Sequence, residues 1–255
     1  MTGSMNFTYG DRTIRVNMPD QTALMAELTR RFRGGEGFAL ATINLDHLVK
    51  LRGDSGFRQA YAAQDLVVAD GNPIVWLSRL ARHPVTLVPG SDLVVPLARL
   101  AAAETVPIAL VGTTELALDA AAARITAEAP GTRIVARIAP PMGFDPDSPV
   151  AGEMLRRIEA SGARLCFLAL GAPKQERLAA RGRRETPGIG FASVGAGLDF
   201  LAGNQQRAPR WVRRIAMEWV WRMLSAPRRL VPRYARCAAI LPAETISALR
   251  QRPGR

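Results

Sequence analysis

The chain has 255 residues, a formal net charge of +12 and two cysteines. This length supports one large domain, or a domain with an appendage, that buries a sizeable core. The two cysteines exclude a secreted disulfide framework and indicate a reducing compartment such as a cytoplasm. Residues 1–20 lack the apolar centre of a signal peptide, and no apolar run approaches the roughly 20 residues that span a bilayer, so any membrane contact is expected to be peripheral.

Short apolar runs alternate with longer segments of helical periodicity, which is the pattern of βα units that build a mostly parallel sheet. The predicted strands are residues 38–43, 66–68, 85–88, 107–111, 133–138, 165–170 and 189–194. The predicted helices are residues 21–33, 45–63, 73–81, 92–103, 115–129, 150–160 and 173–184. Residues suited to helix N-caps precede several of them, namely Asn72, Ser91, Thr113 and Thr114. The expected fold class is therefore α/β.

Positive charge gathers at the C-terminal end of the chain. Residues 207–255 contain 12 arginines, no lysine and two acidic residues, and so carry +10 of the net charge. A nearly neutral core with a cationic tail indicates one localised anionic contact rather than general nucleic-acid binding. The overall preference for arginine, 32 against 2 lysines, explains which basic residue is used but not where the charge accumulates.

From Trp211 the tail has the pattern of an amphipathic basic helix that ends at Pro227. Apolar residues recur at helical spacing, while Arg210, Arg213 and Arg214 fall on another face. The apolar face can pack on the core, dock on a membrane, or do both. We therefore divide the chain into a core of residues 1–205 and a basic helical appendage of residues 206–255.

Polar residues recur just after the predicted strands, where ligands bind in parallel α/β sheets. They form four groups: Thr42, Asn44 and Asp46; residues 70–72; residues 90–92; and residues 171–176. Each group alone is more often a turn or a helix cap. Their recurrence at one edge of the predicted sheet indicates a site.

Asp70 is the carboxylate that we expect to act as a general base. It follows an apolar run, where partial desolvation raises basicity, although a helix N-cap is the simpler interpretation of the same position. Gly71 permits close backbone approach of a ligand. Helices opened by Pro73 and Pro173 offer free N–H groups to an anion, and Lys174 adds a positive charge suited to phosphate.

Other catalytic signatures are weak. His47 and His83 are the only histidines and form no metal-ligand set with the cysteines, which disfavours zinc. The chain lacks a Gly-x-Ser-x-Gly elbow, and residues 195–197 lack the last glycine of a dinucleotide fingerprint. Asp145 and Asp147 could hold a metal as an Asp-x-Asp pair, but in this Pro-rich loop a turn that caps the next helix is favoured.

In their order and spacing, these residues resemble the WecG/TagA/CpsF family of bacterial glycosyltransferases, family 26 in the sugar-transferase classification. The resemblance runs from about residue 42 to residue 234. Its motifs are Thr42-Ile43-Asn44, Asp70-Gly71-Asn72-Pro73, Gly90-Ser91-Asp92, Gly171-Ala172-Pro173-Lys174-Gln175-Glu176, residues 194–203, Arg207-Ala208-Pro209, Glu218-Trp219, Arg222, Pro227, Arg229 and Arg233-Tyr234.

The resemblance implies a Rossmann-like core, flanked by helices, and inverting, metal-independent transfer of a hexose from a UDP-sugar to a polyprenyl-diphosphate-linked saccharide in cell-surface or exopolysaccharide synthesis. The hexose would be of N-acetylmannosamine, glucose or glucuronate type. No cofactor is implied besides the UDP-sugar, which is the donor substrate. The resemblance also implies a peripheral position on the inner face of the bacterial cytoplasmic membrane, contact of the appendage with anionic lipid, a homo-oligomer, and no nucleic-acid partner.

The resemblance further implies roles for individual residues. Asp70 would deprotonate the acceptor hydroxyl, and Thr42 and Asn44 would position the reacting sugars. Arg222 and Arg229 would neutralise the UDP leaving group or the acceptor diphosphate. The residues expected to bind the donor are Gly71, Asn72, Gly90, Asp92, Gly171, Pro173, Lys174, Gln175, Gly195 and Asp199.

Two points stay open at this stage. Family members commonly carry an arginine where this chain has Pro232, which puts one diphosphate contact in doubt.

An alternative of another class is a nonenzymatic module whose basic tail binds nucleic acid or anionic lipid. Such binding would depend steeply on salt and would be indifferent to UDP.

Overall fold

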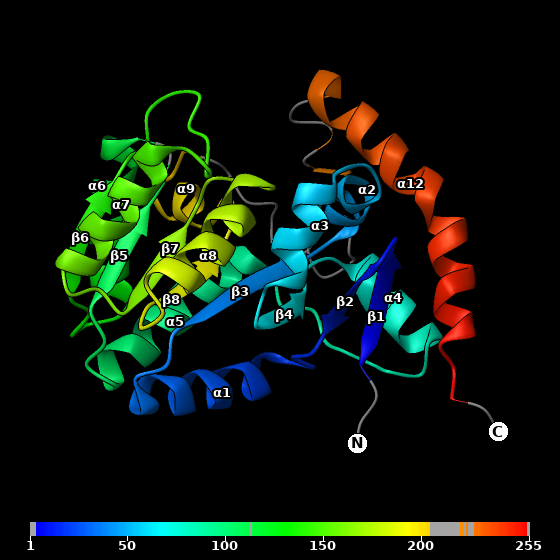
Figure 1. Cartoon of the computed structure of the whole chain (residues 1–255), viewed down its shortest axis with the longest axis horizontal. Coiled ribbons are helices and arrows are strands. Elements are labelled where there is room, and N and C mark those ends of the chain that lie inside the picture. Colours follow the sequence, from blue (N-terminus) through cyan, green and yellow to red (C-terminus); the bar gives the residue numbers. More distant parts are fainter. Residues whose placement is uncertain (1–3, 113, 205–219, 222, 224–226, 254–255) are drawn as a thin grey trace.

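The computed structural model describes residues 4–112, 114–204, 220, 221, 223 and 227–253, with the side chain of Arg229 outside that description. A six-stranded parallel sheet forms its centre, in the order β4-β3-β8-β7-β5-β6 (Figure 1). The strands are β3 (Phe38–Ile43), β4 (Leu66–Ala69), β5 (Ile108–Val111), β6 (Ile134–Ile138), β7 (Leu165–Leu168) and β8 (Gly190–Ser193). All but the edge strand β6 are buried along their whole length, because helices cover both faces of the sheet.

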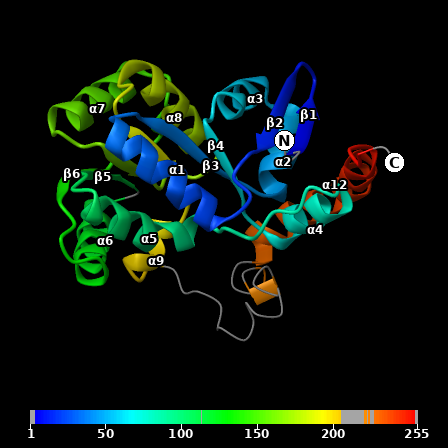
Figure 2. The same cartoon turned by 90° about the horizontal axis from the view of Figure 1, so that it is seen from below.

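The helices form one layer on each face of the sheet (Figure 2). One layer contains α1 (Gln21–Gly34), α5 (Gly90–Ala103), α6 (Glu115–Glu128) and α9 (Gly197–Leu201), which share a core cluster with the strands. The other layer contains α7 (Pro149–Ala160) and α8 (Lys174–Glu185), with α3 (Ser55–Ala62) beside α8. The α/β class and the parallel sheet predicted from the sequence are confirmed.

A third hydrophobic cluster lies at the β4 side of the sheet and includes side chains of β3 and β4. It joins α2 (Leu45–Gly53), α3, α4 (Asn72–Leu80) and an antiparallel hairpin of β1 (Met5–Tyr9) and β2 (Arg12–Val16). The C-terminal helix α12 (Pro227–Arg250) runs along α2 and α4 and adds Ile240 and Ala248 to this cluster (Figures 1 and 2). The appendage thus packs on the core through the part of α12 that carries these residues.

Polar contacts also hold α12 on the core. The carboxylate of Glu244 accepts hydrogen bonds of 2.8 Å from the Tyr9 hydroxyl and 2.7 Å from Arg52. The side-chain amide of Gln251 donates to the carbonyl of Asn6 at 2.7 Å and accepts from its N–H at 2.9 Å. Among the described helices, none is long and apolar enough to cross a bilayer.

Three predictions of secondary structure are wrong. Residues 85–88 form no strand: Val88 makes a single backbone bond to Ala69, and the flanking Pro84 and Pro89 have no N–H for a ladder. The helix predicted over residues 45–63 is two helices, since Asp54 turns the chain and caps α3. The tail was predicted to leave helical structure at Pro227, whereas α12 includes residues 227–250. The helix predicted from Trp211 falls mostly outside the described residues.

Candidate active site

Asn44 and Asp70 meet where two neighbouring strands end. The last residues of β3 and β4, Ile43 and Ala69, are register partners, so the residues that follow emerge side by side. Asn44 caps α2 by accepting the His47 N–H at 3.1 Å, and its amide nitrogen donates to Asp70 Oδ2 at 3.4 Å. The cap thus orients the Asn44 amide toward the carboxylate predicted to be the general base.

Gly71 allows the next helix to begin directly after Asp70. Its φ of 109° lies in the region that favours glycine, and it is the N-cap residue of α4. Asn72 is the first helical residue of α4, and Ser91 lies inside the first turn of α5, so the prediction that they are N-caps is wrong. Thr114 does cap α6, as predicted.

Helix caps differ between the predicted site and the rest of the fold. Side chains cap α1, α2, α3, α6 and α7, namely those of Asp20, Asn44, Asp54, Thr114 and Ser148. Within the described residues, no side chain caps α4, α5 or α8, each of which begins beside residues predicted to bind the donor. The N–H groups of Ile74, Asp92 and Gln175 donate to the carbonyl oxygens of Gly71, Pro89 and Gly171, so an anionic ligand would meet the N–H groups that precede them in these first turns.

Thr42 and Gly90 pack against each other at the end of β8. A Cβ atom at Gly90 would lie 3.1 Å from Thr42 Oγ1, 3.2 Å from Thr42 Cγ2 and 3.4 Å from Val194 Cα. The two distances to Thr42 are tighter than ordinary contacts, so a larger residue here would displace Thr42. Glycine at the start of α5 thereby lets this helix approach the ends of β3 and β8.

The amide of Gln175 is held at both of its ends. Its oxygen accepts the Gly195 N–H at 3.1 Å, and its nitrogen donates to Glu176 Oε1 at 2.8 Å. Burial of the fully enclosed Glu176 raises the pKa of its carboxyl to about 7, and Oε2 of this residue has no hydrogen-bond partner within the described residues. Gln175 thus joins the loops that follow β7 and β8, and a role in donor binding stays a prediction.

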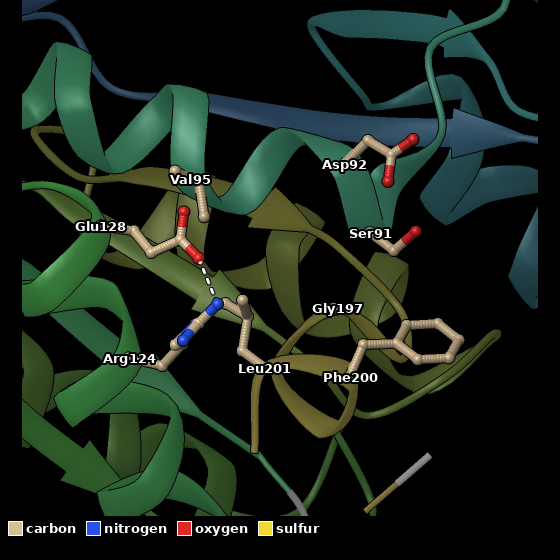
Figure 3. Close-up of a pocket in the computed structure, with 8 residues that line it drawn as sticks. All are labelled: Ser91, Asp92, Val95, Arg124, Glu128, Gly197, Phe200 and Leu201. Atoms are coloured by element: carbon tan, nitrogen blue, oxygen red, sulfur yellow. Dashed lines mark ion pairs between the residues drawn. The ribbon is translucent and has the colours of Figure 1, made fainter. Parts of the chain in front are cut away.

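An open pocket of about 540 Å³ lies between α5, α6 and α9 (Figure 3). Its lining residues are Ser91, Asp92, Val95, Arg124, Glu128, Gly197, Phe200 and Leu201. Asp92 of the predicted donor set faces this pocket, and Asp199 lies in α9 nearby. Arg124 and Glu128 form an ion pair of 2.7 Å in it. This pair was not predicted to belong to the site, because i,i+4 ion pairs are also common on exposed helix faces.

The remaining donor residues belong to the start of α8. Gly171, with φ of 70°, follows β7, and Pro173 is the N-cap residue of α8 after a cis Ala172-Pro173 peptide bond. Lys174 is exposed at the first helical position. Lys50 reaches this loop from α2, with Nζ 3.0 Å from the carbonyl oxygen of Ala172. Lys50 was not predicted to belong to the site, although its spacing from Asp46 indicates an ion pair.

Three other titratable residues considered from the sequence, His47, Asp145 and Asp147, have structural partners. His47 Nδ1 lies 3.2 Å from the Tyr61 hydroxyl, and burial lowers the His47 pKa to about 3, so this ring is neutral. Asp145 accepts the N–H of Asp147 at 3.1 Å in the predicted turn, and Asp147 pairs with Arg177. The cap of the following helix is Ser148, not either aspartate, which corrects that prediction.

The predicted site is thus assembled in part. The structure joins Asn44 to Asp70, Thr42 to Gly90, and Gly195 to Gln175. Arg222 lies outside the described residues, and Arg229 is described only as part of the α12 backbone.

The model of the "Glycosyl transferase WecG/TagA/CpsF family" matches residues 12–255, which is nearly the whole chain and includes both the sheet and α12. The chain therefore belongs to the WecG/TagA/CpsF family of glycosyltransferases, which act in the synthesis of cell-surface polysaccharides.

Proposed function

We propose that the protein is an inverting, metal-independent hexosyltransferase that moves a sugar from UDP to a polyprenyl-diphosphate-linked saccharide. The observation that carries this proposal is the position of Asp70, which contacts Asn44 and directly precedes the uncapped N-terminus of α4. A carboxylate suited to a general base thereby lies beside a helix N-terminus suited to an anion, and displacement of a nucleotide diphosphate uses both kinds of group.

In the proposed reaction, Asp70 removes the proton from the acceptor hydroxyl. The oxygen attacks the anomeric carbon of the donor from the side opposite UDP, the bond from that carbon to the diphosphate oxygen breaks, and the configuration inverts. The N–H groups of α4, α5 and α8 are suited to the charge that develops on UDP. Arg222 and Arg229 are proposed to complete this neutralisation with the planar, permanently charged guanidinium group.

The proposal extends to the acceptor and the membrane. A lipid-linked acceptor requires the enzyme to work at a bilayer surface, and the charge of +10 in residues 207–255 favours anionic headgroups. We accordingly propose a peripheral position on the inner face of the cytoplasmic membrane, and a homo-oligomer. N-acetylmannosamine, glucose and glucuronate are the donor sugars to be distinguished.

The test is a panel of UDP-sugars assayed with a synthetic lipid-diphosphate saccharide, with and without a chelator. One UDP-sugar is expected to be transferred, with the anomeric configuration inverted and the rate unchanged by the chelator. UDP alone is expected to raise the melting temperature, because a ligand that binds only the folded state stabilises it. No transfer from any UDP-sugar and no shift with UDP would overturn the proposal in favour of another donor or of simple anion binding.

A further inference from the structure

A continuous chain of polar contacts joins α12 to the loop between β7 and α8. Arg233 Nε of α12 forms an ion pair of 3.0 Å with Asp46 Oδ1, without the alignment of a hydrogen bond, and Asp46 Oδ2 lies 2.8 Å from Lys50 Nζ. Lys50 Nζ in turn donates to the carbonyl oxygen of Ala172 at 3.0 Å. The carboxylate of Asp46 therefore connects the C-terminal helix to the loop of residues 171–173.

Several features stabilise the charge of Asp46 at this position. Its side chain is 15% exposed, against 35% for Lys50 and 37% for Arg233. It lies in the first turn of α2, where the helix dipole favours a carboxylate. Burial alone would raise the pKa of Asp46, but the hydrogen bond from Lys50 and the charge of Arg233 hold it below its usual value. Salt screens such a partly buried group less than an exposed pair.

We infer that Asp46 is a positioning residue that couples the docking of α12 to the loop of residues 171–173. It acts through Lys50, which holds the carbonyl just before the N-cap residue of α8. It also acts through Arg233, one helical turn after Arg229 in α12. When α12 is docked, the loop and the N–H groups of α8 are held in one arrangement. The catalytic consequence rests on the proposed function, since donor binding gives this loop its role.

A simpler explanation is that Asp46 is one of several residues that merely hold α12 on the core. The same two helices share a second ion pair, in which Arg52 of α2 lies 2.7 Å from Glu244 of α12. The contacts of Glu244 lead to Tyr9 of β1 rather than to the loop. Arg52→Gln is therefore a matched control, because it removes an ion pair between the same two helices and leaves the contacts of Asp46 with Lys50 and Arg233 in place.

The first measurement is hydrogen exchange in the full-length protein without ligand. Arg233→Gln is expected to accelerate exchange of the amides of residues 174–178 about fivefold, as loss of a partly buried ion pair would. Coupling is reciprocal, so Lys50→Met should accelerate exchange in residues 230–236 of α12. Unchanged exchange at these distant segments, or equal changes in Arg52→Gln, would overturn the coupling. This measurement does not depend on the identity of the donor.

The second measurement is the rate of transfer with the UDP-sugar that the panel identifies. Asp46→Asn and Lys50→Met are expected to raise the KM for the donor about tenfold, because misplaced binding groups lose affinity and alignment. Asp46→Glu, which keeps the charge, should recover most of this loss, and Arg52→Gln should leave the KM unchanged. If the KM for the donor is similar in all four variants, the coupling through Asp46 has no effect on donor binding. If no UDP-sugar is transferred, the proposed function fails, whereas hydrogen exchange still decides whether Asp46 couples the two segments.

Discussion

The amide nitrogen of Asn44 lies 3.4 Å from Oδ2 of Asp70, across two parallel strands whose last residues are register partners. The amide that caps α2 therefore also contacts the carboxylate at the end of β4. The sheet itself determines this pairing, so the distance is expected to be kept when loops around the site move.

Asp70→Asn is expected to reduce sugar transfer at least about a thousandfold, because an amide cannot accept the proton of the acceptor hydroxyl. The side chain keeps its size and its position beside Asn44, so the melting temperature and the shift produced by UDP should change little. Transfer rates and UDP-dependent melting curves of the two proteins provide the measurement. Asp119→Asn is a suitable control, since Asp119 pairs with Arg137 on the β6 side of the sheet. Near-normal turnover by Asp70→Asn would show that another group is the base.

Gly90→Ala is expected to lower transfer about tenfold or more. The added methyl group would meet the Thr42 side chain at 3.1–3.2 Å, so either Thr42 or the start of α5 must shift by a few tenths of an ångström. Gly188→Ala is the control, because a Cβ atom at that position has no heavy atom within 4 Å. If both variants retain full activity, close packing between Gly90 and Thr42 does not matter for the reaction.

Glu176→Gln is expected to change how stability depends on pH. The folded protein keeps this carboxyl protonated up to about pH 7, whereas the unfolded chain releases the proton above about pH 4.5. Between these values the folded state binds more protons, so the free energy of unfolding falls as pH rises, by up to about 3 kcal/mol. Glutamine cannot ionise and should remove this fall.

Urea unfolding of both proteins at pH 5, 6, 7 and 8 provides the measurement for Glu176. His47 affects stability in the opposite direction. Burial lowers its pKa to about 3, so below about pH 6.5 the unfolded chain binds a proton that the folded protein does not. The contribution of the neutral His47 to the free energy of unfolding is therefore lost as pH falls. That contribution is present in both proteins and cancels in their difference. Parallel pH profiles for the parent and Glu176→Gln would contradict the raised pKa.

Glu244→Gln is expected to lower the free energy of unfolding by about 2 kcal/mol, because Arg52 and the partly buried Tyr9 hydroxyl lose a charged partner. The loss corresponds to a fall in melting temperature of about 5 °C. Tyr9→Phe removes one hydrogen bond but leaves the ion pair, so it should cost about 1 kcal/mol. Equal stability of Glu244→Gln and the parent in thermal unfolding would mean that this contact contributes little to docking of α12.

The parts of the fold that the sequence predicted are those with local signals. Strands β3, β7 and β8 are short apolar runs, and their burial on both faces explains that composition. The polar residues that follow these strands could be grouped into one site from the sequence alone, because parallel strands have their carboxyl ends at the same edge of the sheet. Residues 85–88 are equally apolar but cover the end of β4 as a loop, and composition cannot distinguish the two cases.

The contacts that the sequence could not predict join distant segments. The i,i+4 spacing of Asp46 and Lys50 indicates a pair, but Arg233 reaches Asp46 only because α12 packs along α2. The hairpin of β1 and β2 has short strands with polar residues on one side, and burial of Phe7 and Ile14 depends on a cluster that also includes α12. Where such an appendage docks is decided by packing over the whole chain.

The pairing of Gln251 with Asn6 joins residues 245 apart in the chain. A ribosome delivers the hairpin of β1 and β2 first and α12 long afterwards. During that interval the cluster that contains the apolar side chains of the hairpin lacks Ile240 and Ala248. Contacts of such long sequence separation form slowly. The hairpin is therefore synthesised well before the cluster to which it belongs can be completed, and nascent chains expose part of this surface until α12 has been made.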